Sequence, residues 1–111
     1  MSTPDERAAE NEALWREVNE NVEAAATRLD VAPGGDARFV CECGADRCTE
    51  MIEVPLLVYE SVRANPRRFL VLPAHVTREV EHVVERAPGY AIVEKDTPDS
   101  IRIVEERDPR A

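Results

Sequence analysis

Residues 41–48 read Cys-Glu-Cys-Gly-Ala-Asp-Arg-Cys and contain all three cysteines of the chain. A β-strand places residues i and i+2 on the same face, so the first two cysteines can aim their sulfurs at one point. Gly44 then allows a backbone conformation that a side chain would hinder, and four intervening residues bring Cys48 back. The stretch therefore predicts a zinc knuckle with three thiolate ligands, which needs one more ligand to complete a tetrahedron.

Two histidines are candidates for the fourth ligand. His75 follows a predicted strand and two turn-like residues, where its side chain can be fixed at a rigid edge. His82 falls inside a predicted helix among glutamates, on the face opposite the valines, and is expected to be solvated. His75 is therefore the preferred ligand, and the cofactor is Zn²⁺. The predicted metal ligands are Cys41, Cys43, Cys48 and His75.

Other interpretations of the cysteine cluster stay open. The fourth ligand could be a carboxylate of Glu42, Asp46 or Glu50, a cysteine from a second subunit, or water. The three thiols could also be small buried residues without a metal, although charged neighbours are unusual in a buried run. An iron–sulfur cluster usually needs four cysteines, which this chain does not have.

The C-x-C-x4-C spacing resembles the post-SET zinc motif found at the end of many histone lysine methyltransferases. The resemblance runs from Cys41 to about Ile52 and includes the glycine after the second cysteine. In that family the three thiolates share a zinc ion with a fourth cysteine from the neighbouring SET domain. Such a domain does not fit in 111 residues, so the resemblance implies zinc and no methyltransferase activity.

A longer part of the chain resembles a family of small uncharacterised bacterial proteins. The shared features begin with Arg-Glu-Val-Asn-Glu at residues 16–20 and continue through the C-x-C-G-x3-C run. They include Tyr-Glu-x-Val-Arg at residues 59–63, the histidine after a Pro-x pair at His75, and Tyr90. No established activity comes with this resemblance, which supports a role for His75 and nothing further.

Composition and charge limit the class of protein. Hydrophobic residues make up 43% of the 111 residues but aromatic residues only 5%, so we expect a single, mostly aliphatic core. A bound metal ion would add stability to a core of this kind. The formal charge of −9 repels phosphates, so we expect neither nucleic acid nor membrane as a partner. The N-terminus lacks the hydrophobic core of a signal peptide. Clustered cysteines then favour a cytoplasmic metal site over disulfides.

The N-terminal segment has the signature of a long amphipathic helix. Residues 3–6 read Thr-Pro-Asp-Glu, in which Thr3 can cap the helix and Glu6 stands at the capping-box position. Helical sequence continues to about Asp30, before a Pro-Gly-Gly loop. One apolar stripe predicts docking on the rest of the chain or a dimeric coiled coil. The stripe consists of Trp15, Val18, Val22, Ala25 and Leu29, broadened by Leu14.

The expected architecture is a small single α+β domain with a long N-terminal helix and a short mixed or antiparallel sheet. Residues 1–30 form the helix, residues 36–106 form the zinc-binding α+β domain, and the charged tail is expected to be frayed. The expected strands are residues 37–43, 50–54, 69–72, 90–94 and 101–104, with a hairpin turn at residues 96–99 between the last two. The later helices are expected at residues 55–65 and 78–86.

These features predict a small cytoplasmic zinc-binding module with a structural metal and a role in interaction or regulation. A protein partner or a second copy could bind through the N-terminal helix. The alternative is a thiol-based redox or metal sensor, in which a disulfide releases the zinc. A third possibility is a small-molecule or enzymatic site on a catalytic zinc. Three thiolates weaken zinc as a Lewis acid, so the sequence favours a function other than catalysis.

Overall fold

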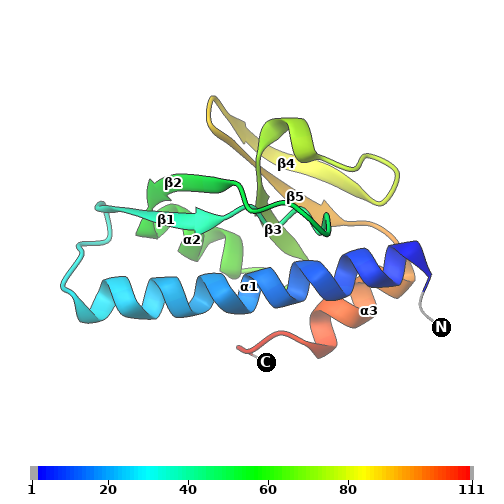
Figure 1. Cartoon of the computed structure of the whole chain (residues 1–111), viewed down its shortest axis with the longest axis horizontal. Coiled ribbons are helices and arrows are strands. Elements are labelled where there is room, and N and C mark those ends of the chain that lie inside the picture. The colour runs from blue at the N-terminus through cyan, green and yellow to red at the C-terminus, as the bar shows by residue number, and fades with distance from the viewer. Residues whose placement is uncertain (1–2, 111) are drawn as a thin grey trace.

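The structure is a computed structural model and describes residues 3–110. In chain order its elements are α1 (Pro4–Arg28), β1 (Asp36–Val40), β2 (Met51–Pro55), α2 (Leu56–Arg63), β3 (Arg68–Val71), the 3₁₀-helix η1 (Pro73–His75), β4 (Glu81–Ala87), β5 (Tyr90–Lys95) and α3 (Pro98–Glu106). Helix α1 runs the length of the molecule, the strands lie on one side of it, and α3 packs beside it (Figure 1). This is the predicted α+β fold with a long N-terminal helix, and both of its sheets are antiparallel.

Helix α1 begins with the capping box that the sequence predicts. The Thr3 side chain accepts a hydrogen bond of 3.1 Å from the Glu6 backbone N–H, and Glu6 Oε1 accepts one of 3.0 Å from the Thr3 N–H. Pro4 occupies the first turn, where its missing N–H leaves no helical hydrogen bond unmade. The predicted division at residue 30 into a helix and a zinc-binding domain stays a prediction.

The buried face of α1 is more polar than the sequence suggests. No member of the predicted apolar stripe is fully buried, and Leu29 at its end is 79% exposed. Arg16 is buried instead and donates to the backbone oxygens of Pro66 at 2.8 Å and Val104 at 2.7 Å. Its guanidinium carbon also lies 5.1 Å from the centre of the Phe69 ring. The buried residues of α1 are Ala9, Glu12, Ala13, Arg16, Asn19 and Ala26.

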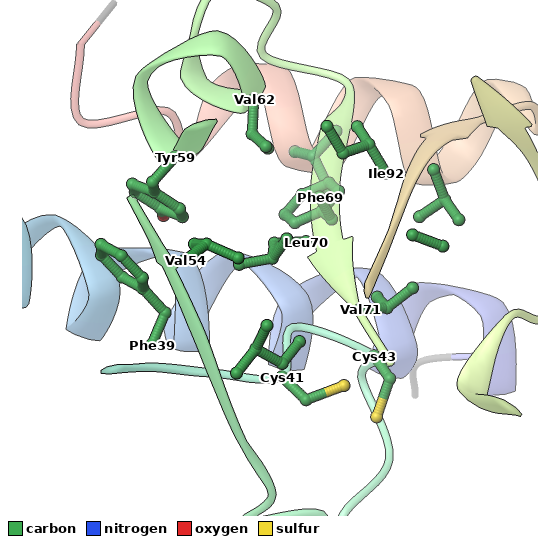
Figure 2. Close-up of a cluster of buried hydrophobic side chains, with 14 of the residues drawn as sticks. Phe39, Cys41, Cys43, Val54, Tyr59, Val62, Phe69, Leu70, Val71 and Ile92 are labelled. Atoms are coloured by element: carbon green, nitrogen blue, oxygen red, sulfur yellow. The ribbon is translucent and has the colours of Figure 1, made fainter. Parts of the chain in front are cut away.

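The two sheets meet in one apolar core. Strands β1 and β2 pair as a hairpin, with Phe39 opposite Ile52. The second sheet has the strand order β3-β5-β4, which makes β5 its central strand. Side chains from both sheets and from α2 form a single cluster (Figure 2), in which the rings of Phe39 and Tyr59 stack with centroids 4.4 Å apart. The hairpin, α2 and the larger sheet are therefore packed as one unit.

Strand β4 contradicts the helix predicted over residues 78–86. It pairs with β5, and a bulge between Val83 and Glu85 shifts its register. Ala87 pairs with Tyr90, so a two-residue turn connects the strands as a tight hairpin. The valines at 80, 83 and 84 have spacings that also fit a helix. Their β-branched side chains suit a strand, and the bulge hides the alternation that would have revealed it.

Helix α3 contradicts the strand predicted over residues 101–104. The Thr97 side chain accepts a hydrogen bond of 3.3 Å from the Ser100 N–H, and Pro98 stands in the first turn. Ser100, Ile103 and Val104 are buried, and their spacing places them on one helical face. The Thr-Pro pair, which resembles a hairpin turn, is therefore a helix start, and α3 packs against α1.

The C-terminal tail is held in place, contrary to the expected fraying. Asp108 forms an ion pair with buried Arg63. Arg110 bridges Glu20 and Glu23 of α1 to Glu60 of α2, with nearest N–O distances of 2.7–2.8 Å. Among residues 3–110, no helix is both long enough and apolar enough to cross a membrane.

Candidate metal centre

The four predicted ligands come from two separate parts of the fold. Cys41 directly follows β1, and Cys43 and Cys48 lie in the loop that connects β1 to β2. His75 is the last residue of η1, which follows β3. Figure 2 shows the sulfurs of Cys41 and Cys43 close together at the edge of the apolar cluster. The site therefore lies between the β1–β2 hairpin and the chain that leaves the larger sheet.

The four donor atoms lie near enough to one another to bind a metal ion. His75 Nδ1 lies 3.6 Å from the sulfur of Cys41 and 3.5 Å from the sulfur of Cys48. All four donor atoms, including the Cys43 sulfur, lie within 4.8 Å of one another. In a tetrahedron with Zn–S bonds of about 2.3 Å and a Zn–N bond of about 2.0 Å, sulfur and nitrogen are about 3.5 Å apart. The structure thus brings the predicted residues together in a group that can hold a metal ion.

The other candidate ligands have different partners. Glu42 points away from the sulfurs into the interior, where Leu70, Asn19 and Tyr59 donate to it. Asp46 accepts a hydrogen bond of 2.8 Å from Asn11. His82 lies on β4, not on the predicted helix, and its exposed ring pairs with Asp96 at 2.6 Å. Glu50 is exposed, and its backbone oxygen accepts from the Cys41 N–H.

The cysteine segment is hydrogen-bonded along the free edge of β3. The Glu42 N–H donates to the Leu70 oxygen at 2.8 Å, and the Leu70 N–H donates to Glu42 Oε1 at 2.9 Å. Two residues after Leu70, the Leu72 N–H donates to the Cys41 sulfur at 3.2 Å. The strand predicted to reach residue 43 ends at Val40, so Glu42 and the cysteines on either side of it lie in a non-strand segment, and both sulfurs lie with His75. These bonds fix the cysteine segment against β3.

Glu42 is a residue whose role the sequence did not reveal. Its carboxylate is fully buried and accepts from Asn19 Nδ2 at 2.8 Å and from Tyr59 Oη at 2.7 Å, in addition to the Leu70 N–H. Burial raises the pKa of Glu42, although these hydrogen bonds oppose the shift. A lone glutamate between two cysteines suggests a solvated or ligating side chain. Only the positions of α1, α2 and β3 show that it anchors the segment.

Helix α1 packs against the metal loop, which is the segment of residues 41–48 that contains the three cysteines. Gly44 has a φ of +79°, and a Cβ atom at this position would lie 2.9 Å from the backbone oxygen of Ala8 and from the Glu12 side chain. Asn11 Nδ2 donates to the Gly44 oxygen at 3.2 Å. The conformational freedom predicted for Gly44 is therefore confirmed, and the close contact with α1 adds a second reason for glycine.

The three thiols influence one another's pKa values. A hydrogen bond with Cys41 lowers the pKa of Cys43 to about 5, and the same bond together with burial raises the pKa of Cys41. Cys41 and Cys43 are buried, whereas Cys48 is only partly buried. The cluster thus gathers sulfur and nitrogen donors, one of them a thiol with a lowered pKa, which is a favourable setting for a thiophilic cation.

Three sulfurs and one imidazole nitrogen form a donor set that can bind a metal ion. Comparison with models of protein families, with curated proteins and with solved structures finds no match for the chain. The interpretation of the site therefore depends on its own geometry.

Proposed function

We propose that the protein is a small cytoplasmic zinc-binding domain whose metal has a structural role and whose function is interaction or regulation. The observation that carries the proposal is the spacing of the donors, with His75 Nδ1 at 3.5 Å and 3.6 Å from two sulfurs and all four donors within 4.8 Å. Thiolate and imidazole ligands together favour Zn²⁺ over the harder cations Mg²⁺ and Ca²⁺.

A structural role is supported by what the metal would connect. Cys41, Cys43 and Cys48 belong to the β1–β2 hairpin, and His75 follows the larger sheet, so one ion would join the two sheets. Four protein donors fill a tetrahedron and leave no position for a substrate or water, which favours a structural over a catalytic metal. Structural zinc contributes on the order of 10 kcal/mol, comparable to the whole net stability of a small domain.

A redox or metal sensor is the second candidate, and the uneven burial of the cysteines supports it. Cys48 is the most accessible of the three thiols. Hydrogen peroxide would convert the Cys48 thiolate to a sulfenic acid and release hydroxide. A neighbouring thiolate would then displace a second hydroxide to form a disulfide, and the zinc would lose two ligands.

The metal content of the purified protein tests the proposal. Protein prepared under reducing conditions without chelators should contain one zinc per chain. Cys41→Ser, Cys43→Ser and Cys48→Ser should each abolish stoichiometric binding, whereas His82→Ala, a change of the exposed histidine on β4, should not. Unmutated protein that contains no metal would contradict the proposal. Stoichiometric zinc that one equivalent of peroxide releases, and a reductant restores, would favour the sensor.

A further inference from the structure

The three thiols of the metal loop differ in how easily a small solute can reach them. Cys41 is fully buried, and its sulfur accepts a hydrogen bond of 3.2 Å from the Leu72 N–H. Cys48 is only partly buried. Cys43 is 9% exposed, but together with His75 it lines a surface pocket of about 280 Å³. A small oxidant can therefore reach Cys43 and Cys48, whereas Cys41 is covered.

The path of the chain also brings Cys43 and Cys48 together. The β1–β2 pairing continues past the end of β1, because the Cys41 N–H donates to the Glu50 oxygen at 2.8 Å. The same register, continued by two residues, sets Cys43 opposite Cys48 on the two arms of a turn. That turn is closed by a bond of 3.2 Å from the Cys48 N–H to the Ala45 oxygen. The two sulfurs lie within 4.8 Å of each other, so a small movement suffices to join them.

The other two disulfides meet obstacles in the structure. A bond between Cys41 and Cys43 would close a ring around the single residue Glu42, which is bonded to Leu70 through both its backbone and its carboxylate. Such a short ring distorts disulfide geometry and stores strain. A bond between Cys41 and Cys48 would need the covered sulfur, which the β3 side of the site already holds. The pair Cys43–Cys48 is therefore favoured.

We propose that a hydroperoxide oxidises this site to a Cys43–Cys48 disulfide, which releases the metal ion and frees His75. This regulation rests on the proposed metal-binding function. The Cys48 thiolate attacks one oxygen of hydrogen peroxide, the O–O bond breaks, and a sulfenic acid and a hydroxide ion form. The Cys43 thiolate then attacks the Cys48 sulfur, the S–O bond breaks, and another hydroxide leaves. The two sulfurs supply the two electrons that reduce the peroxide, and the metal ion keeps its charge.

The part of the fold that this reaction frees is the 3₁₀-helix η1. None of its residues is buried, and His75 Nδ1 connects it to the sulfurs of Cys41 and Cys48. The disulfide removes two of the four donors, and the remaining thiolate and imidazole bind zinc much more weakly. The hydrogen bonds between Glu42 and Leu70 involve no cysteine side chain, so they keep the hairpin on β3. The oxidised protein therefore stays folded, and a reductant can restore the site.

Disulfide mapping of the unmutated, full-length protein tests the inference. Cleavage after Arg47 by trypsin and after Glu42 by a glutamate-specific protease places each cysteine on its own peptide, namely residues 39–42, 43–47 and 48–50. The zinc-loaded protein receives one equivalent of hydrogen peroxide, free thiols are alkylated, and the unreduced digest is measured by mass spectrometry. Peptides 43–47 and 48–50 should be joined and Cys41 alkylated. The bound zinc should be lost and should return after dithiothreitol and zinc are added.

Hydrogen exchange on the same samples locates the change. The His75 amide, which donates to the Leu72 oxygen at 2.9 Å, should lose protection on oxidation, whereas the amides of Glu42 and Leu70 should keep theirs.

A disulfide that includes Cys41, a disulfide between two chains, or zinc that stays bound after one equivalent of peroxide would overturn the inference. Loss of protection at Glu42 and Leu70 would also overturn it, because the hairpin would then have left β3. The zinc content before peroxide shows separately whether the proposed function has failed, since the disulfide can be mapped equally well in protein without metal.

Discussion

The backbone N–H of Leu70 donates a hydrogen bond of 2.9 Å to Oε1 of Glu42, while the Leu70 oxygen accepts one of 2.8 Å from the Glu42 N–H. The residue that separates Cys41 from Cys43 is thus bound to β3 through both its backbone and its side chain. Anchoring Glu42 also fixes the two cysteines beside it, whose sulfurs lie with His75. The apolar core and the metal site are therefore positioned by the same segment.

Replacing Glu42 should harm the fold more than replacing a nearby exposed glutamate. Glu42→Ala removes the carboxylate that accepts hydrogen bonds from Leu70, Asn19 and Tyr59. The Leu70 N–H loses its partner, whereas Asn19 Nδ2 keeps the Val40 oxygen and Tyr59 Oη keeps a 3.5 Å contact with the Arg16 oxygen. An unmatched buried donor costs about 1–3 kcal/mol, so the variant should lose about 2 kcal/mol or more. Urea unfolding of the metal-loaded protein measures this, with exposed Glu50→Ala as the control. Equal losses in the two variants would contradict the anchoring role.

Gly44 should not tolerate alanine. Its φ of +79° strains any residue with a Cβ, and that atom would meet the Ala8 backbone oxygen at 2.9 Å, which cannot move without α1. Gly44→Ala should therefore lower stability by about 1–3 kcal/mol and weaken metal binding. Gly34→Ala is the control, because nothing lies within 4 Å of its added Cβ. If both variants melt at the same temperature, the proposed contact between α1 and the loop is wrong.

The buried group formed by Glu12, Lys95 and Glu81 should make stability depend on pH. Lys95 Nζ lies 3.0 Å from Glu12 and 3.2 Å from Glu81, and all three side chains are about 1% exposed. Burial lowers the pKa of Lys95, but the two carboxylates raise it by more, so the amine stays charged. Burial raises the pKa of Glu12 to about 8, Lys95 opposes this shift, and Glu81 adds to it.

The sign follows from which state holds the proton. Between pH 4.5 and about 8 the folded protein keeps a proton on Glu12 that the unfolded chain has lost. Raising the pH through this window therefore favours unfolding. From pH 6 to pH 8 the unmutated protein should lose about 2 kcal/mol relative to Glu12→Gln, which mimics the protonated acid. Urea unfolding of both metal-loaded proteins checks this, and parallel pH profiles would mean that Glu12 is ionised throughout.

The two histidines should differ sharply in their effect on zinc binding. His75 Nδ1 lies among the sulfurs, whereas His82 is exposed and pairs with Asp96. Removing an outer partner of a ligand costs about 10–100-fold in metal affinity, so losing a ligand in His75→Ala should cost about 100-fold or more. His82→Ala should change the affinity little. A competitive zinc titration of the two variants at one pH gives the answer, and unchanged affinity in His75→Ala would move the fourth ligand elsewhere.

Local signals predicted much of this fold, because several elements carry their own start and stop residues. Thr3 and Glu6 mark the start of α1, and the alternating strand at Met51–Pro55 pairs with β1. Cys41, Cys43 and Cys48 lie close in sequence, and only the position of His75 after a strand was needed to complete the site. The structure confirms that the four residues gather.

Burial of polar residues could not be predicted in the same way. Glu12, Arg16 and Asn19 lie outside the apolar stripe that was predicted for α1, and they are buried because their partners come from segments distant in the sequence. The errors at β4 and α3 have local causes. Valines whose spacing fits either structure lie next to a bulge in β4, and in α3 a Thr-Pro pair starts a helix where a turn was expected.

X-ray absorption at the zinc edge of the unmutated, purified protein tests the central claim most directly, because it reports the atoms bound to the metal. A site formed by Cys41, Cys43, Cys48 and His75 should give three sulfur neighbours at about 2.3 Å and one nitrogen at about 2.0–2.1 Å, with one metal per chain. A protein without stoichiometric metal, or a metal with fewer than three sulfurs or with no imidazole nitrogen, would contradict the account.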